Sequence, residues 1–422
     1  MFSARTEWTF TPNRLALHLD ERRRQGLPVL DLTESNPTRC AFEFDQQAIL
    51  DLLRHPRSLI YEPEPRGLRS ARAAVADYYA GRGAIVDPHQ IFLTTSTSEA
   101  YSYVFRLLAN PGDVVLTPRP SYPLFDFLTR LNDVEMVHYP LVAPREGDRR
   151  SFFVGDTHGD ASLAGDRNWQ IDLEALGKTV RAPRAVGKCS PRVRAILAVH
   201  PNNPTGSFVK PRELDVLLDL CHRHHLALIT DEVFADYTFA PTGSPAASHA
   251  GAARALTFTL SGLSKISALP QMKLAWLVVN GPPDELTAAL ARLEVIADTY
   301  LSVSTPLQHA LPGLLALRRQ VQPQILARVR QNLAWLDRRL ADNLPVTRIP
   351  REGGWYAILR VSTSRTDEDW AVELLTREGV MVHPGHFYDF DSEGQLVVSL
   401  LPAPGVFQEG MDRALHLMNA LF

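Results

Sequence analysis

Short apolar runs alternate with amphipathic stretches over much of the chain, from about residue 68 to residue 279. The apolar runs are rich in β-branched residues and lack the polar alternation of a half-exposed strand, which predicts strands covered on both faces. We expect strands at 91–95, 114–117, 195–199, 227–230, 257–260 and 274–279, and helices at 68–80, 96–110, 122–132 and 211–225. This alternation predicts an α/β fold with a mostly parallel sheet flanked by helices.

The two ends of the chain follow a different pattern. An amphipathic helix is expected at 14–24, stopped by Gly26, and a long helical stretch begins at residue 285. More helices and two strands, at 355–360 and 396–400, complete the C-terminal part. We therefore predict a large domain at 50–295 and a smaller α+β domain formed by 1–49 plus 296–422. The polar segment 145–166, rich in glycine and aspartate, is expected to be a surface excursion.

Composition excludes several classes of function. The chain has 422 residues, of which 45% are hydrophobic and 22% charged, as in ordinary globular proteins. A formal net charge of −3 gives no electrostatic reason to expect nucleic acid or an anionic membrane as a partner. Apolar runs stay far below the roughly 18 residues that cross a bilayer, and the N-terminus lacks the pattern of a signal peptide. We expect a protein without a membrane anchor.

Cysteines and histidines add little chemistry of their own. Three scattered cysteines fit unpaired thiols in a reducing cytoplasm: Cys40, Cys189 and Cys221. Three histidines near residue 222 lie on different sides of a predicted helix, and we expect no metal site from them: His222, His224 and His225.

Polar side chains follow three of the predicted strands. His200-Pro-Asn-Asn-Pro-Thr-Gly206 comes after the first, Asp231 ends the second, and Ser261-Gly-Leu-Ser-Lys265 ends the third. Open α/β sheets bind ligands in the crevice at the carboxyl ends of their strands. A carboxylate, an amide and an amine that meet there suit a pyridinium cofactor, with Asp231 on the ring nitrogen, Asn203 on the ring phenolate and Lys265 in a Schiff base.

Each of these pieces has an ordinary structural explanation. Asn-Pro-Thr-Gly is turn chemistry, an aspartate after a strand is often a helix cap, and most lysines are exposed. Their joint occurrence, with Asp231 placed 28 positions after Asn203 (231 − 203) and each piece at a strand end, favours the functional reading.

From about Leu32 to its C-terminus the chain resembles the class I/II aminotransferases, which are fold-type I pyridoxal phosphate-dependent enzymes. The specific matches are Asn202-Asn-Pro-Thr-Gly206, Asp231 and Ser264-Lys265. The resemblance implies pyridoxal 5′-phosphate as cofactor and a Schiff base on Lys265. It also implies transfer of an amino group between an amino acid and a 2-oxo acid. No further cofactor is needed.

The resemblance also assigns contacts to the cofactor. Ser96-Thr-Ser98 matches the phosphate-binding turn at a helix start, although Ser96 and Glu99 also form a capping-box pattern. Tyr122 matches an aromatic ring that stacks on the pyridine. Tyr61 matches a tyrosine that reaches the phosphate of a partner subunit, which implies a homodimer.

Three positions depart from the family pattern. Phe234 replaces a tyrosine that donates to the ring phenolate, which should leave the Schiff base more basic unless Asp236 or Tyr237 compensates. Lys273 replaces a phosphate-binding arginine and keeps only its charge. Val397 lies about where an arginine grips the substrate carboxylate, so Arg39, with Arg360 behind it, is the candidate for that role.

Two other functions fit parts of this pattern. A lyase or decarboxylase on the same scaffold is the alternative in mechanism, because the fold does not fix the fate of the carbanion. A regulator that keeps the domain only as an effector sensor is a different class. Such regulators carry an N-terminal DNA-binding module, and the resemblance begins too near the N-terminus to leave room for one.

Overall fold

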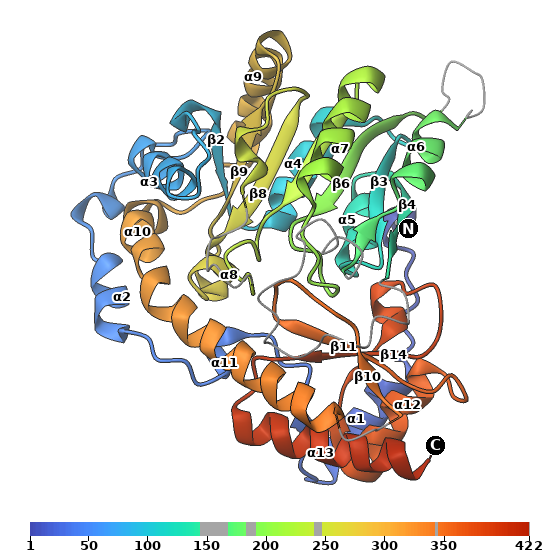
Figure 1. Ribbon diagram of the computed structural model, residues 1–422. Coiled ribbons are helices and arrows are strands. Elements are labelled where there is room, and N and C mark those ends of the chain that lie inside the picture. Colours follow the sequence, from blue (N-terminus) through green and yellow to red (C-terminus); the bar gives the residue numbers. More distant parts are fainter. Residues whose placement is uncertain (144–167, 183–190, 240–246, 342–344, 422) are drawn as a thin grey trace, which may run out of the picture.

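The computed structural model describes residues 1–143, 168–182, 191–239, 247–341 and 345–421. Two sheets lie in the upper and lower parts of the molecule in Figure 1. The predicted excursion at 145–166 and Cys189 lie outside the described residues. None of the described helices is long and apolar enough to cross a membrane.

The upper sheet has eight strands. In spatial order they are β2 (Ile91–Thr94), β9 (Ala275–Asn280), β8 (Thr257–Gly262), β7 (Ala227–Asp231), β6 (Val193–Val199), β3 (Val114–Arg119), β4 (Glu135–Val142) and β5 (Gln170–Ile171). Strands β8, β7, β6, β3 and β4 pair in parallel, whereas β9 is antiparallel to both of its neighbours and β5 is antiparallel to β4. The mostly parallel sheet predicted from the sequence is confirmed.

Helices cover both faces of this sheet, which explains why its strands are apolar throughout. One face packs against α4 (Thr97–Leu108), α5 (Leu124–Leu131) and α9 (Pro283–Tyr300). The other packs against α3 (Arg69–Ala80), α6 (Leu173–Arg181), α7 (Pro211–His224), α8 (Leu263–Ile266) and α10 (Thr305–Ala316). Neighbouring residues of one strand serve opposite faces, as Leu228 and Ile229 do in β7.

The lower sheet is antiparallel. Its order is β10 (Thr347–Arg348), β11 (Tyr356–Arg360), β14 (Gln395–Ser399) and β13 (His383–Pro384). Helices α11 (Arg318–Leu340), α12 (Asp367–Glu373) and α13 (Pro404–Ala420) share its core. The N-terminal segment joins this part through α1 (Arg14–Arg24), which contacts α12, and through β1 (Leu30–Asp31), which pairs with β12 (Val380–Met381).

Helix α10 follows the proposed domain boundary at 295–296 but packs against α3 and α2 (Gln46–Leu52) beside the upper sheet. The division into 50–295 and 1–49 plus 296–422 therefore stays a prediction.

Candidate active site

The carboxyl ends of five strands meet at one edge of the upper sheet. Strands β3, β6, β7 and β8 are parallel, and β2 has the same direction because two antiparallel pairings through β9 relate it to β8. The sequence that follows each strand supplies one part of the predicted site: Ser96–Ser98, Tyr122, Asn203, Asp231 and Lys265. The topology thus brings these predicted residues to the same edge.

Asp231 is the last residue of β7 and is buried. Its Oδ2 accepts a hydrogen bond from the Tyr101 hydroxyl at 2.8 Å, and its Oδ1 accepts one from Val233 N at 3.0 Å. Burial raises the pKa of this carboxyl to about 6, whereas these two donors and the charge of Lys265 act to lower it. At neutral pH the carboxylate is therefore mostly ionised.

Lys265 lies in α8, one turn after β8 ends. Its Nζ is 5.0 Å from the centroid of the Trp355 ring and 5.4 Å from that of Phe234. Burial lowers the pKa of this amine to about 8, against the raising effect of the Asp231 carboxylate. A larger share of Lys265 is therefore neutral, and nucleophilic, at neutral pH than for an exposed lysine.

The loop after β6 places two asparagines differently. Asn202 is used structurally, because its Nδ2 donates to Pro120 O and to the Thr205 hydroxyl, both at 3.0 Å. Asn203 is also buried, but its Oδ1 has no hydrogen-bond partner among the described residues. An unpaired buried carboxamide oxygen is costly, so this side chain is available to a bound group.

Glycine is required where this loop meets the lower sheet. Gly206 has φ +69, and a Cβ there would lie 2.4 Å from Gly353 O. The close approach holds the loop against the segment that carries Trp355.

The start of α4 leaves backbone donors at the strand edge. Ser96 is the N-cap, and its hydroxyl accepts from Glu99 N at 3.1 Å. The predicted capping box is shifted by one residue, because Glu99 Oε2 accepts from Thr95 N at 2.7 Å. Since the Ser96 hydroxyl is used in capping, Thr97 and Ser98 are the better placed of the three for a phosphate group.

Aromatic rings surround the rest of the site. Tyr122 follows β3, keeps 39% of its surface exposed and packs edge-on against Phe125. Phe234 packs edge-on against Trp355. Tyr237 and Asp236 were the candidates to replace the hydroxyl that Phe234 lacks, and both have other partners. The Tyr237 hydroxyl donates to Lys265 O at 2.6 Å, and Asp236 forms an ion pair with Arg82.

The structure places the remaining predicted residues further from this centre or nearer the surface. Ser264 precedes Lys265 in α8, and Lys273 is exposed after the turn that follows it. Tyr61 is 74% exposed, before α3.

No cation stands at the position of Val397, which is fully buried in the core of the lower sheet. The side chain of Arg39 is 75% exposed, and its guanidinium lies 3.9 Å from the Glu34 carboxylate. Arg360 ends β11, opposite Gln395.

Sequence reasoning did not identify Tyr101 or Trp355 as site residues. Tyr101 lies one helical turn after Thr97, which faces it toward the sheet, but that spacing is equally typical of a core residue. Trp355 comes from the lower part of the fold, and its approach to Lys265 depends on how the two parts pack.

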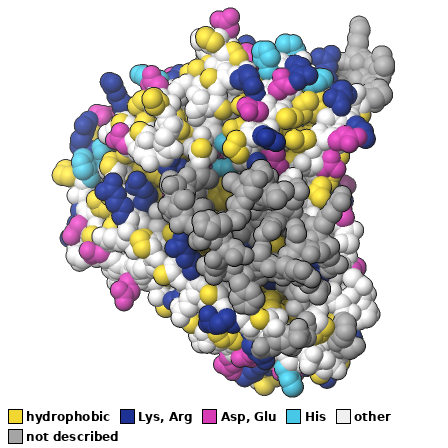
Figure 2. Space-filling view, in the orientation of Figure 1, with side chains coloured by type: hydrophobic (Ala, Val, Ile, Leu, Met, Phe, Trp, Pro, Cys, Tyr) yellow, Lys and Arg dark blue, Asp and Glu magenta, His cyan; other side chains and the backbone are white. Residues whose placement is uncertain are grey.

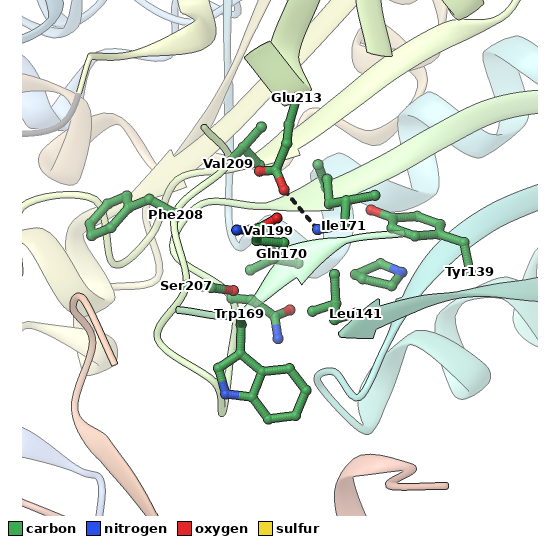
Figure 3. Close-up of a pocket in the computed structure, with 13 residues that line it drawn as sticks. Tyr139, Leu141, Trp169, Gln170, Ile171, Val199, Ser207, Phe208, Val209 and Glu213 are labelled. Carbon is green, nitrogen blue, oxygen red and sulfur yellow. Dashed lines mark hydrogen bonds between the residues drawn. The ribbon is translucent and has the colours of Figure 1, made fainter. Parts of the chain in front are cut away.

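A small pocket lies beside the site (Figure 3). It is lined by residues of β4, β6 and the Asn202 loop, and Trp169, Glu213 and Tyr139 border it. The Glu213 carboxylate accepts from Ile171 N at 2.7 Å, as the dashed line marks. The pocket has room for about one water molecule, so it does not hold a substrate.

Side chains of both charges are mixed on the described surface of the face drawn in Figure 2. A protein that tracks a nucleic-acid backbone instead gathers its basic side chains into a stripe.

Comparison with known proteins places the chain in a family. It is 25% identical over 417 residues to the glutamate–pyruvate aminotransferase AlaA of Haemophilus influenzae, covering 96% of this chain and 93% of that protein. It is 26% identical over 391 residues to the Escherichia coli protein of the same name, covering 90% and 87%.

Solved structures agree at the level of the fold. An alanine aminotransferase from Pyrococcus furiosus superposes with a TM-score of 0.83 at 20% identity, with both chains fully covered. An Escherichia coli aminotransferase gives 0.79 at 22% identity, covering 99% and 98%. The sequence profile of the family described as aminotransferase class I and II matches residues 29–410, and the chain belongs to that family.

Proposed function

We propose that this aminotransferase binds pyridoxal 5′-phosphate at the strand edge and moves an amino group between an amino acid and a 2-oxo acid. The observation that carries the proposal is the meeting of Lys265, Asp231 and Asn203 at one sheet edge. The amine has a pKa lowered to about 8, the carboxylate is buried, and the carboxamide oxygen is unpaired. When bound, the cofactor supplies an aldehyde for amines and a ring that stabilises negative charge at the substrate Cα.

The residues present fit this group. Asp231 would accept the ring N–H, Asn203 would hold the ring phenolate and Lys265 would bind the aldehyde carbon. Backbone and hydroxyl groups at the start of α4, namely Ser96, Thr97 and Ser98, would hold the phosphate with help from Ser264, Lys273 and the Tyr61 of a second copy. Tyr122 would stack on the ring.

Lys265 then acts on the substrate as base and acid. Its neutral Nζ would accept the Cα proton, and the resulting ammonium would donate that proton to the cofactor's C4′ carbon. The rings of Trp355 and Phe234 lie 5.0 and 5.4 Å from Nζ and form the apolar side of its surroundings. Asp231 would keep its negative charge beside the cofactor and would stabilise positive charge on the ring nitrogen.

Alanine, glutamate and their 2-oxo acids are the first substrates to test, since the relatives at 25–26% identity are named for glutamate and pyruvate. Without an acceptor, an amino donor should release one equivalent of 2-oxo acid per cofactor and change the cofactor's absorbance once. Adding a second 2-oxo acid should restore the first spectrum and give continuous turnover. Continuous turnover without an acceptor would instead identify a lyase or decarboxylase.

The same titration tests Arg39 as the group that binds the substrate carboxylate. Losing a charged hydrogen-bond partner costs about 1.5–3 kcal/mol, so Arg39→Ala should raise KM for an amino acid roughly ten- to a hundredfold. The cofactor spectrum should not change. The amine that lacks the carboxylate should react equally well with both enzymes.

The control for this variant is Arg24→Ala, because Arg24 is also exposed and also lies beside a glutamate, Glu21. An unchanged preference for the acid in Arg39→Ala would eliminate Arg39 and make Arg360 the next candidate. A native enzyme that is indifferent to the carboxylate would indicate an amine substrate.

We propose a homodimer in which Tyr61 reaches the phosphate of the second copy. Leu59 is 93% exposed and Tyr61 74%, and Tyr61 borders an open pocket with Leu301 and Gln308. Sedimentation should show a dimer, and Tyr61→Phe should weaken cofactor affinity about tenfold without dissociating it. A fully active monomer would contradict the shared site.

A cytoplasmic location is part of the proposal, since Cys40 and Cys221 are buried free thiols.

A further inference from the structure

Tyr101 contacts the carboxylate that the proposed function assigns to the ring nitrogen. Its hydroxyl donates to Asp231 Oδ2 at 2.8 Å across 130 positions of sequence, and both side chains are buried. Val233 N donates to the other carboxylate oxygen at 3.0 Å. Each oxygen therefore has one fixed donor and keeps one lone-pair direction for another partner.

The hydroxyl is held rigidly. Tyr101 lies in α4 and is 2% exposed. Its ring packs edge-on against Phe125, with centroids 5.4 Å apart, and lies 5.9 Å from the ring of Phe105. Burial raises the pKa of Tyr101 well above its usual value, so its hydroxyl stays a neutral hydrogen-bond donor at the pH values where Asp231 titrates.

The charged and titratable groups around Asp231 act in opposite directions. Burial has the largest influence on the pKa of the carboxyl and raises it, the charge of Glu232 also raises it, and the net value is about 6. Val233 N–H, the Tyr101 hydroxyl and the charge of Lys265 lower it. Burial raises the pKa of Tyr122, and the charge of Asp231 also raises it. Among these, Tyr101 is the side-chain donor that holds the carboxylate directly.

We propose that Tyr101 is a positioning residue that keeps Asp231 ionised and oriented in the buried site. The inference rests on the proposed function for the identity of the group that Asp231 meets. A donor to the carboxylate stabilises its charged form, so the proton shared with a ring nitrogen stays on the nitrogen. Helix α4 also offers its first turn to the phosphate, so one rigid element would serve both ends of the cofactor.

The test is the titration of Asp231 in the full chain without cofactor. Aspartate labelled with ¹³C at its side-chain carboxyl gives a signal that Asp231→Asn identifies. The midpoint should lie near 6 in the native protein. A hydrogen bond to a charged group changes an equilibrium about ten- to a hundredfold, so Tyr101→Phe should raise the midpoint by about one to two pH units.

A matched control and a second variant separate this effect from a packing defect. Tyr103→Phe removes a buried hydroxyl from the same helix, 3.4 Å from Ser302, and should leave the midpoint unchanged. Replacing Tyr101 with 3-fluorotyrosine keeps the hydroxyl and makes it a stronger donor, so the midpoint should fall. A midpoint that stays fixed in both Tyr101 variants overturns the proposal.

Cofactor binding distinguishes failure of this inference from failure of the proposed function. Pyridoxamine 5′-phosphate cannot bond covalently to Lys265, and its affinity should weaken as the pH falls through the Asp231 midpoint in native protein and Tyr101→Phe alike. Matching midpoints support both ideas. Suppose that Tyr101→Phe shifts the titration midpoint of Asp231, but the affinity for pyridoxamine 5′-phosphate does not change across that midpoint. Tyr101 then still positions Asp231, and the assignment of Asp231 to the ring nitrogen is wrong.

Discussion

Replacing Lys265 with alanine is expected to lower turnover by about 10⁴-fold, the upper end of what a positioned acid–base group contributes. The variant would lose the amine that we propose bonds to the cofactor and takes the Cα proton. The amine is suited to both tasks because burial lowers its pKa to about 8. Nothing in the packing should fail, since Lys265 lies among rings that remain in place.

Single-turnover absorbance after mixing with an amino donor measures this loss. Borohydride reduction of the native enzyme, followed by peptide mapping, should recover the cofactor on the peptide that contains Lys265. Lys178→Ala is the matched control, because Lys178 is an exposed lysine paired with Glu174. Near-native turnover in Lys265→Ala, or label on a different lysine, would show that the assignment is wrong.

Replacing Asp231 with alanine is expected to lower turnover by about 10³-fold while some cofactor remains bound. Removal of one preorganised electrostatic partner typically costs about 10²–10³-fold, and a buried charge belongs at the upper end. The ring nitrogen would lose its anionic partner, and the Tyr101 hydroxyl and Val233 N–H would lose their acceptor. Phosphate and phenolate contacts would be unaffected, which explains the residual binding.

Turnover and cofactor affinity must be measured separately for this variant, because the prediction is a large effect on the first and a smaller one on the second. Glu232→Gln is a suitable control. Glu232 is the next residue and also a buried carboxylate, but it accepts from Ser248 Oγ at 2.7 Å and His249 N at 2.6 Å. Near-native turnover in Asp231→Ala would mean that another group keeps the ring nitrogen protonated.

The departures from the family pattern change how the lysine is surrounded. Phe234 brings a ring, and no hydroxyl, within 5.4 Å of Lys265 Nζ, and Trp355 closes another side. The Tyr237 hydroxyl donates to the backbone carbonyl of Lys265, and Asp236 is paired with Arg82. Neither side chain therefore replaces the tyrosine hydroxyl that is missing at Phe234. The amine thus has two apolar neighbours, and the partial loss of solvent around it lowers its pKa to about 8.

The sequence was sufficient for six of the eight strands of the upper sheet and for the edge at which the candidate site lies. Runs such as 195–199 and 227–230 are apolar at every position because helices cover both faces of the sheet, and this pattern is local. The polar residue after each run had to lie at the carboxyl edge once the strands were parallel. Strand β4 was not predicted. Most of its residues are half-buried and its two ends are exposed, since it lies near the edge of the sheet.

Only the tertiary structure decided which side chains meet there. Tyr101 has the pattern of an ordinary core residue in an amphipathic helix, and only the packing of α4 on the sheet brings its hydroxyl to Asp231. Arg39 lies just past the N-terminal segment that was expected to line the active site, yet its side chain is mostly exposed beside Glu34. Periodicity and strand order depend on neighbours in sequence, whereas these contacts join residues far apart, and their distances are set by how helices and sheets pack.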